Sequence, residues 1–166
     1  MKRRLLPVLA GVLMAHATGQ VADAIDEAWW YRLTNASLGE SYSLDTANDG
    51  INDPMMAPTG NYSGQFWRFS AEGSAYRMTN AFLGLGRSLD NIADGSNPLF
   101  MCESNQYKGQ RWHLTPAGEG YFRLTNDDLG DSRPLDTRPE WPYRPFPGKT
   151  GNSQSQLWKL TKVRRR

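Results

Sequence analysis

Three aspartates recur along the chain at nearly equal intervals and are the first candidates for chemistry. They are Asp45, Asp90 and Asp136, which are separated by 45 and 46 residues. A glycosidase would need two carboxylates about 5 to 10 Å apart on either side of one bond. One carboxylate in each of three repeated units suits repeated binding better than paired catalysis. An aspartate before a turn can equally accept hydrogen bonds from backbone N–H groups, so the spacing alone leaves a binding role and a structural role open.

Other reactive side chains are scarce. The histidines are His16 and His113, and the single cysteine is Cys102. This set cannot supply the usual four ligands of zinc, and it suggests no Ser-His-Asp arrangement. We expect His113 to lie on the surface and Cys102, within the apolar stretch LFMCES, to be a buried and inert thiol. We therefore expect no enzymatic activity, no metal site and no cofactor.

One acidic loop could attract calcium. It contains Asn48, Asp49, Asn52 and Asp53. These residues do not follow the order of an EF-hand loop, and the related loops of the chain lack equivalent carboxylates. A solvated turn is the better interpretation.

Each aspartate belongs to a repeated unit that also contains a Gln-x-Trp motif. The motif occurs as SGQFW, KGQRW and QSQLW, and its glutamines are Gln65, Gln110 and Gln156. The steps are again 45 and 46 residues, and such a period is interpreted before any single residue. We expect three units at about residues 29–73, 74–119 and 120–163.

The units are expected to consist of short strands. The stretches YRLT and FWRFS alternate apolar and polar residues, which is typical of a strand with one buried face. Asn, Asp and Gly between them tolerate tight turns. Four strands per unit give about twelve strands, and a β-propeller would need at least four units. The sequence therefore predicts an all-β fold, a β-trefoil with pseudo-three-fold symmetry, whose core contains Trp67, Trp112 and Trp158.

Three Gln-x-Trp motifs on this period, each preceded by Leu-Asp, closely resemble the ricin B-chain-like (R-type) β-trefoil lectins. In that family, an aspartate binds paired sugar hydroxyls, an aromatic ring stacks on the sugar, and the glutamine steadies the aspartate. The resemblance assigns these roles to Asp45, Asp90 and Asp136, to Phe100 and Phe146, and to Gln65, Gln110 and Gln156. It implies a lectin, with galactose-type glycans as the common ligand.

The chain departs from the family pattern in three ways. The Asn that usually precedes the glutamine is replaced by Gly64, Gly109 and Ser155. The ring position of the first unit holds Met55, so the second and third units are expected to carry the best sites. The family's disulfide within a repeat is absent, because Cys102 stands at one of its two positions and Ser88 at the expected partner position. Tyr62 and Tyr107 could offer other stacking surfaces, or could simply pack against turns.

The first 24 residues are expected to be a signal peptide. MKRR is a basic start, Leu5–Met14 is an apolar run too short to span a membrane, and small residues allow cleavage after Ala17 or Ala24. The trefoil would then occupy residues 25–163, followed by a basic tail at 164–166. The chain would be secreted or otherwise exported.

The charge balance argues against a nucleic-acid partner. Without Lys2, Arg3, Arg4 and Asp23 the chain has 16 basic and 16 acidic residues. Five of the basic residues lie in the last eight positions, where a solvated, frayed terminus is expected, so the rest is mildly acidic.

The sequence as a whole predicts a monomeric, carbohydrate-binding module with up to three shallow sites. Its partners would be glycans or polysaccharides, with no nucleic acid and no stable membrane insertion. The alternative is a trefoil with degenerate sugar pockets that acts as a protein–protein interaction or inhibitor module.

Overall fold

The computed structural model of the protein describes residues 25–91 and 98–165. The expected signal peptide at residues 1–24 lies outside the described residues. Within the described part, each repeat contributes four strands and one short 3₁₀ turn. Repeat 1 contains β1 (Trp29–Asn35), β2 (Gly39–Thr46), β3 (Pro54–Pro58), the turn η1 (Ser63–Gln65) and β4 (Trp67–Glu72). Repeat 2 contains β5 (Ala75–Asn80), β6 (Arg87–Asn91), β7 (Leu99–Glu103), η2 (Lys108–Gln110) and β8 (Trp112–Pro116). Repeat 3 contains β9 (Tyr121–Asn126), β10 (Leu135–Thr137), β11 (Pro145–Pro147), η3 (Gln154–Gln156) and β12 (Trp158–Arg165).

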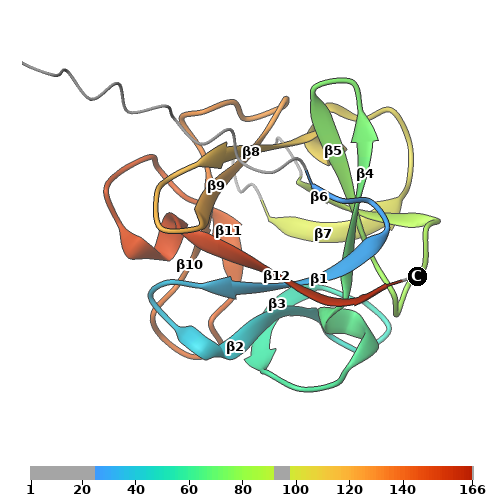
Figure 1. The fold of residues 1–166 in the computed structure, drawn as a ribbon, viewed down its shortest axis with the longest axis horizontal. Coiled ribbons are helices and arrows are strands. Elements are labelled where there is room, and N and C mark those ends of the chain that lie inside the picture. The colour runs from blue at the N-terminus through green and yellow to red at the C-terminus, as the bar shows by residue number, and fades with distance from the viewer. Residues whose placement is uncertain (1–24, 92–97, 166) are drawn as a thin grey trace, which may run out of the picture.

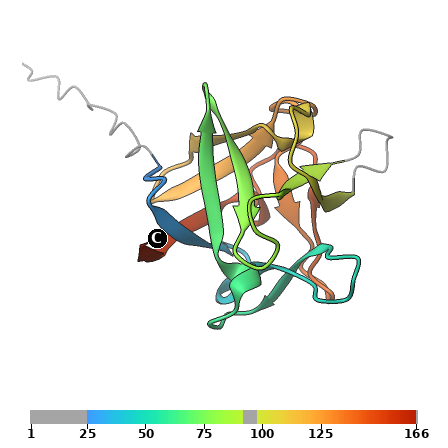
Figure 2. The same ribbon diagram turned by 90° about the vertical axis from the view of Figure 1, so that its right-hand side faces the viewer.

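The first and last strands of each repeat build a closed barrel. They pair in the order β12-β9-β8-β5-β4-β1, and an additional pairing of β12 with β1 closes the ring. The two middle strands of each repeat form a hairpin: β2–β3, β6–β7 and β10–β11. Figures 1 and 2 show these hairpins gathered at one end of the barrel. The predicted β-trefoil is confirmed.

Three symmetry-related indoles fill the core as the repeat predicts. Trp67, Trp112 and Trp158 are all buried, and each Nε1–H donates to the carbonyl of the residue just before the repeated aspartate. The distances are 2.8 Å to Leu44, 3.0 Å to Leu89 and 2.9 Å to Leu135. Because the indole N–H is satisfied, a large ring can be buried without the cost of an unpaired donor. Each tryptophan therefore ties the last strand of its repeat to the strand that carries the aspartate.

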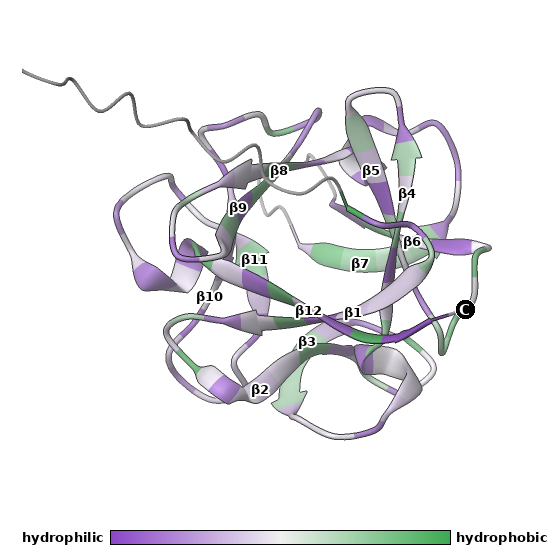
Figure 3. Ribbon diagram, in the orientation of Figure 1, coloured by the Kyte–Doolittle hydropathy of each residue, from purple (hydrophilic) through white to green (hydrophobic). Residues whose placement is uncertain are grey.

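The cap hairpins place each aspartate opposite the predicted ring position. The register pairs Asp45 with Met55, Asp90 with Phe100 and Asp136 with Phe146. Directly paired residues project from the same face of a hairpin. The strands β3, β7 and β11 contact one another around the pseudo-three-fold axis, and their hydrophobic colouring is visible in Figure 3.

The last strand includes two basic residues that the sequence analysis placed in a C-terminal tail, Arg164 and Arg165. The last strand, β12, continues through Arg165 and pairs Trp30 with Arg164 and Trp29 with Arg165. Arg164 and Arg165 are therefore held by strand pairing and by stacking. The Arg164 guanidinium lies 4.6 Å from the centre of the Phe66 ring. In the described ranges, no helix is long and apolar enough to cross a membrane.

Candidate functional site

The repeated aspartates all bind the same two internal donors. One carboxylate oxygen accepts the backbone N–H of the following residue at 2.7 to 2.8 Å. The other accepts the amide Nε2–H of the repeat's glutamine, at 2.9 Å for Asp45, 3.0 Å for Asp90 and 2.8 Å for Asp136. The expected Asp–Gln pair is therefore present in every repeat, and it fixes the carboxylate relative to the backbone.

The glutamines are oriented by their own backbone partners. Each Nε2 also donates to a carbonyl seven residues earlier, and each Oε1 accepts a backbone N–H from five residues earlier. Reversing the amide would set its oxygen against the carboxylate and its N–H₂ against a donor, which is unfavourable at both ends. The buried glutamine therefore presents its donor to the aspartate.

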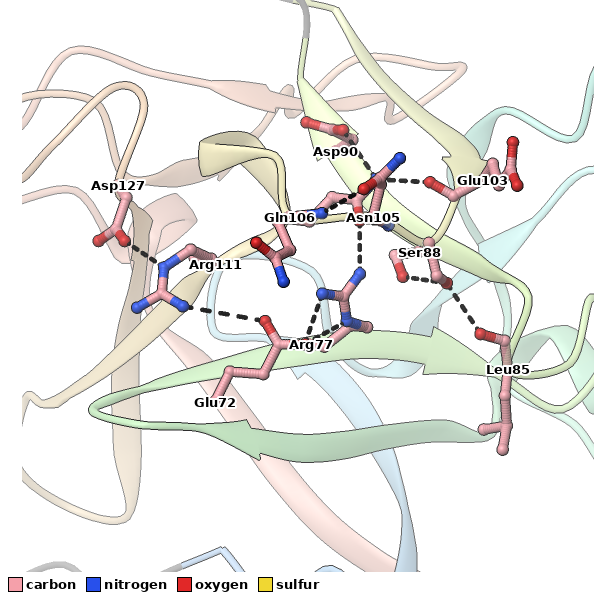
Figure 4. A network of polar contacts seen from close by, with 12 residues as sticks. Glu72, Arg77, Leu85, Ser88, Asp90, Glu103, Asn105, Gln106, Arg111 and Asp127 are labelled. Carbon is pink, nitrogen blue, oxygen red and sulfur yellow. Dashed lines mark hydrogen bonds and ion pairs between the residues drawn. The ribbon is translucent and has the colours of Figure 1, made fainter.

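An arginine that the sequence analysis missed strengthens this arrangement in two repeats. The guanidinium of Arg77 donates to Gln110 Oε1 at 2.7 Å, and that of Arg123 donates to Gln156 Oε1 at 2.8 Å. Arg77 also pairs with Glu72, so the chain of polar contacts runs from Asp90 to the surface (Figure 4). In repeat 1 the equivalent Arg32 bonds the Gly60 carbonyl instead, at 2.6 Å. The signal was present, because these arginines recur with the same 45- and 46-residue steps.

The residue before each glutamine decides where the carboxylate can lie. A Cβ atom added at Gly64 would overlap Asp45 Oδ1, and one added at Gly109 would overlap Asp90 Oδ1. In both repeats the carboxylate therefore lies directly over the 3₁₀ turn. In repeat 3 this position is Ser155, and Asp136 instead approaches Gly148, where an added Cβ would overlap Oδ2. In repeats 1 and 2 the carboxylate thus occupies the space that a side chain before the glutamine would take.

Repeat 1 contains an open pocket beside its aspartate. The cavity has a volume of about 370 Å³, and Asp45, Thr46, Met55, Tyr62, Gly64 and Phe82 contribute to its lining. Tyr62 is 62% exposed and Phe82 is 39% exposed. Phe82 belongs to repeat 2, so the neighbouring repeat supplies a ring that the local sequence of repeat 1 lacks. This differs from the expectation that repeat 1 would have the poorest site.

The other two aspartates are less accessible. Asp90 is 4% exposed and Asp136 is 7% exposed. Residues 92–97, which follow β6, lie outside the described part of the chain. The residues equivalent to Phe82 are not aromatic: they are Asp128 beside repeat 2 and Ser37 beside repeat 3. The Asp128 carboxylate accepts a hydrogen bond from Asn91 Nδ2 at 2.9 Å.

The two predicted rings of repeats 2 and 3 come together elsewhere. Phe100 and Phe146 both line a cavity of about 580 Å³ at the axis, and the residues lining that cavity include neither Asp90 nor Asp136. Each ring is opposite its aspartate on the hairpin, but it also borders this shared axial space. The structure therefore brings the two phenylalanines to one pocket rather than to two.

The remaining reactive groups have internal partners. The Cys102 Sγ–H donates to Asp90 Oδ2 at 3.2 Å, and burial, together with this bond and the negative charge of Asp90, raises the pKa of the thiol to about 11. His113 Nε2 is 2.5 Å from Asp127 Oδ1; this hydrogen bond, with that from Arg111, lowers the pKa of Asp127. Asp49 accepts the N–H groups of Ile51 and Asn52 in the acidic loop. Among residues 25–91 and 98–165, no cluster of three or more His, Cys, Asp and Glu could hold a metal ion.

Comparison with known proteins identifies the fold. No family profile and no curated protein sequence matches the chain. The designed three-fold symmetric protein ThreeFoil is similar, with a TM-score of 0.70 and 19% identity over 81% of this chain and 99% of that one. SeviL bound to asialo-GM1 saccharide gives a TM-score of 0.61, 20% identity and coverage of 82% and 99%. An exo-β-1,3-galactanase from Clostridium thermocellum gives 0.71, 24% identity and 84% coverage of this chain. The match covers 31% of that enzyme, so the chain spans about a third of its length.

Proposed function

We propose that the protein is a carbohydrate-binding module whose principal sugar site is the repeat-1 pocket. The observation that carries this proposal is the Asp45 carboxylate, which is fixed by two internal donors and lines a cavity that is also lined by two exposed aromatic residues. A fixed acceptor beside aromatic surface suits a ligand that has hydroxyl groups on one side and C–H groups on another.

The hydrogen-bonding capacity of Asp45 fits a pair of hydroxyls. An ionised carboxylate has about four lone-pair directions, two on each oxygen. Thr46 N–H occupies one direction on Oδ1, and the Gln65 amide occupies one on Oδ2. One direction on each oxygen is left for a ligand, and hydroxyl donors to a charged acceptor form the stronger class of hydrogen bond. Gln65 therefore positions the carboxylate, and Asp45 contacts the sugar.

Tyr62 and Phe82 provide the apolar part of the site. Aromatic rings offer rigid contact area at a small cost in conformational entropy. Met55 extends this surface, since its side chain also lines the pocket. Met55 occupies the position where the resemblance expects a stacking ring. Tyr62 from the turn and Phe82 from the next repeat thus provide the aromatic surface instead.

Similar proteins support a saccharide ligand, since SeviL is bound to asialo-GM1 saccharide and another neighbour is a galactanase. Galactose-type ligands are therefore the first to test. Single shallow sites bind weakly because a monosaccharide buries little area, whereas several sites on one rigid body raise avidity for a polymer. We further propose that the chain is exported, acts as a monomer and catalyses no reaction.

The test compares isosteric substitutions in the three repeats. Asp45→Asn removes the charge and replaces one acceptor oxygen by a donor, so we expect affinity for galactose oligosaccharides to fall about tenfold or more. Asp90→Asn and Asp136→Asn should have smaller effects, because both carboxylates are buried. Asp131→Asn, which changes an exposed carboxylate of repeat 3, is the control for net charge. Affinity is measured by NMR titration.

Two outcomes would contradict the proposal in different ways. If only Asp90→Asn or Asp136→Asn weakened binding, sugar binding would stand but its assignment to repeat 1 would be wrong. If a glycan array showed no ligand for the wild-type protein, the function itself would be wrong. The burial of Asp90 and Asp136 would then favour the interaction or inhibitor module.

A further inference from the structure

The axial cavity is a second concave site, separate from the Asp45 pocket. Its lining residues come from or adjoin β3, β7 and β11, which contact one another. Figure 1 shows these three strands near the middle of the view. Its volume of about 580 Å³ is within the range of about 300 to 1,000 Å³ that is usual for small-molecule sites. None of its lining residues contributes to the lining of the repeat-1 pocket.

The three repeats contribute unequal chemistry to equivalent positions of this cavity. The third strand of each repeat begins with a residue that lines the cavity, and the residue just before it lines the cavity too. The preceding residues are Asp53, Pro98 and Arg144, and the first strand residues are Pro54, Leu99 and Pro145. Symmetry would give three identical walls, but one position holds an acid, one an apolar residue and one a cation. At this position repeat 1 thus contributes a negative charge to the cavity, repeat 2 no charge and repeat 3 a positive charge.

The apolar side of the cavity is formed by rings and buried aliphatic groups. Phe100 and Phe146 are half-buried, so their rings are partly accessible, whereas Leu99 is buried. Two aromatic rings at one small cavity give a stacking surface comparable to that of Tyr62 and Phe82 in repeat 1.

The polar side of the cavity carries a net positive charge. Arg144 Nη1 pairs with Asp53 Oδ2 at 3.1 Å, so these two charges largely offset each other. The Arg138 guanidinium lies 5.3 Å from the centre of the Phe146 ring, and it has no ion pair with any residue of the described ranges. Its planar fork is suited to a carboxylate or another oxyanion. The Phe146 ring holds the guanidinium at the cavity by a cation–π contact.

We propose that the axial cavity binds an acidic sugar unit. The pyranose would lie against Phe100 and Phe146, and its carboxylate or sulfate would be bound by Arg138. This inference rests on the proposed function in taking the ligand to be a saccharide. It adds a charge preference that the aspartate sites cannot have, because a carboxylate repels an acidic sugar.

The experiment uses the full chain and matched ligands. Trigalacturonate is compared with its methyl ester, which is neutral and of similar shape, and a galactose 6-sulfate disaccharide tests the other oxyanion. Binding is measured by isothermal titration calorimetry at two salt concentrations. We expect trigalacturonate to bind about tenfold or more tightly than the ester, and Arg138→Gln to remove that difference. Binding should weaken in high salt, because the contact is between exposed charges. Lys149→Gln, which removes an exposed cation outside the cavity, is the control and should leave the difference intact.

The outcomes separate this inference from the proposed function. Equal affinity for trigalacturonate and its ester, or a preference that survives Arg138→Gln, would overturn the acidic-sugar site even if Asp45→Asn still abolished neutral-sugar binding. A preference lost in Arg138→Gln but unchanged in Asp45→Asn would support it, whatever happens to neutral sugars. Tight binding of the sulfate ligand but not of trigalacturonate would support the site and identify sulfate as its anion. Equally tight binding of benzoate would overturn the assignment to a saccharide.

Discussion

Repeat 1 and repeat 3 hold the same aspartate and glutamine in the same hydrogen bonds, but their surroundings differ. Asp45 lines an open pocket, whereas Asp136 is 7% exposed. The geometry between the two paired side chains is nearly identical, with Nε2–Oδ2 distances of 2.9 and 2.8 Å. Access to the carboxylate is therefore decided by residues outside the Asp–Gln pair.

Two equivalent positions differ between these two repeats. The turn residue before the glutamine is Gly64 in repeat 1 and Ser155 in repeat 3. The carboxylate packs directly against this turn only in the repeats that have a glycine there. The wall contributed by the following repeat is Phe82 beside Asp45, and its equivalent beside repeat 3 is Ser37. A repeated motif can thus keep one polar geometry while its neighbours give each copy a different ligand surface.

The largest effect is expected from filling the space over the turn of repeat 1. In Gly64→Ala the new methyl group would overlap Asp45 Oδ1, and the carboxylate must move away from its pocket position. Overpacking of this kind costs about 1 to 3 kcal/mol, so we expect the free energy of unfolding in urea to fall by that amount. Sugar binding at the repeat-1 pocket should weaken at the same time.

Gly86→Ala is the matched control for this substitution. A Cβ atom at Gly86 meets nothing within 4 Å, and neither glycine has a positive φ that would strain an alanine. We expect Gly86→Ala to leave the unfolding free energy unchanged or to raise it by about 0.4 to 1 kcal/mol, because alanine restricts the unfolded chain. Equal stabilities of the two variants would show that Asp45 does not need the space over Gly64.

Local patterns in the sequence predict the scaffold of these sites well. The Asp–Gln pairs and the buried indoles join residues of a single repeat, so a 45- or 46-residue period is enough to identify them. Arg77 and Arg123 could have been found by the same spacing, because each bonds the glutamine of its own repeat.

The ligand surfaces are not predictable in this way, because they form between repeats. Phe82 contacts the pocket of the preceding repeat, and its counterparts Ser37 and Asp128 share its spacing but not its chemistry. Phe100 and Phe146 line one cavity only once the three hairpins have packed together. The sequence of repeat 1 alone has Met55 at the position of Phe100 and Phe146, and therefore predicts a sugar site without an aromatic ring.

A smaller effect is expected from exchanging the wall residues. Phe82→Ser gives repeat 1 the residue found at the equivalent position beside repeat 3. Since an aromatic contact contributes about 0.5 to 1.5 kcal/mol beyond its area, we expect sugar affinity to fall roughly two- to tenfold in an NMR titration. Stability should change little, because the ring is 39% exposed.

The reverse exchange sharpens the comparison. Ser37→Phe supplies repeat 3 with a ring, yet we expect no more than about a twofold gain in affinity at that repeat, because the Asp136 carboxylate stays buried against Gly148. A large gain would show that the wall residue, rather than access to the carboxylate, limits binding there.

The smallest effect concerns repeat 2, where Cys102 occupies the position of Ala57 in repeat 1 and Gly148 in repeat 3. Burial, the hydrogen bond to Asp90 and the charge of Asp90 together raise the pKa of this thiol to about 11. A raised pKa keeps the thiol protonated at neutral pH, so alkylation by iodoacetamide should be slow and its rate should rise with pH until close to that value.

Asp90→Asn removes the negative charge beside the thiol, so the inflection of the alkylation rate with pH should move to lower pH, and the rate at pH 8 should rise a few-fold. Burial, the largest cause of the raised pKa, remains in this variant. Asp136→Asn should leave the profile unmoved. An unmoved profile in Asp90→Asn would mean that neither the hydrogen bond nor the charge of Asp90 contributes to the raised pKa of Cys102.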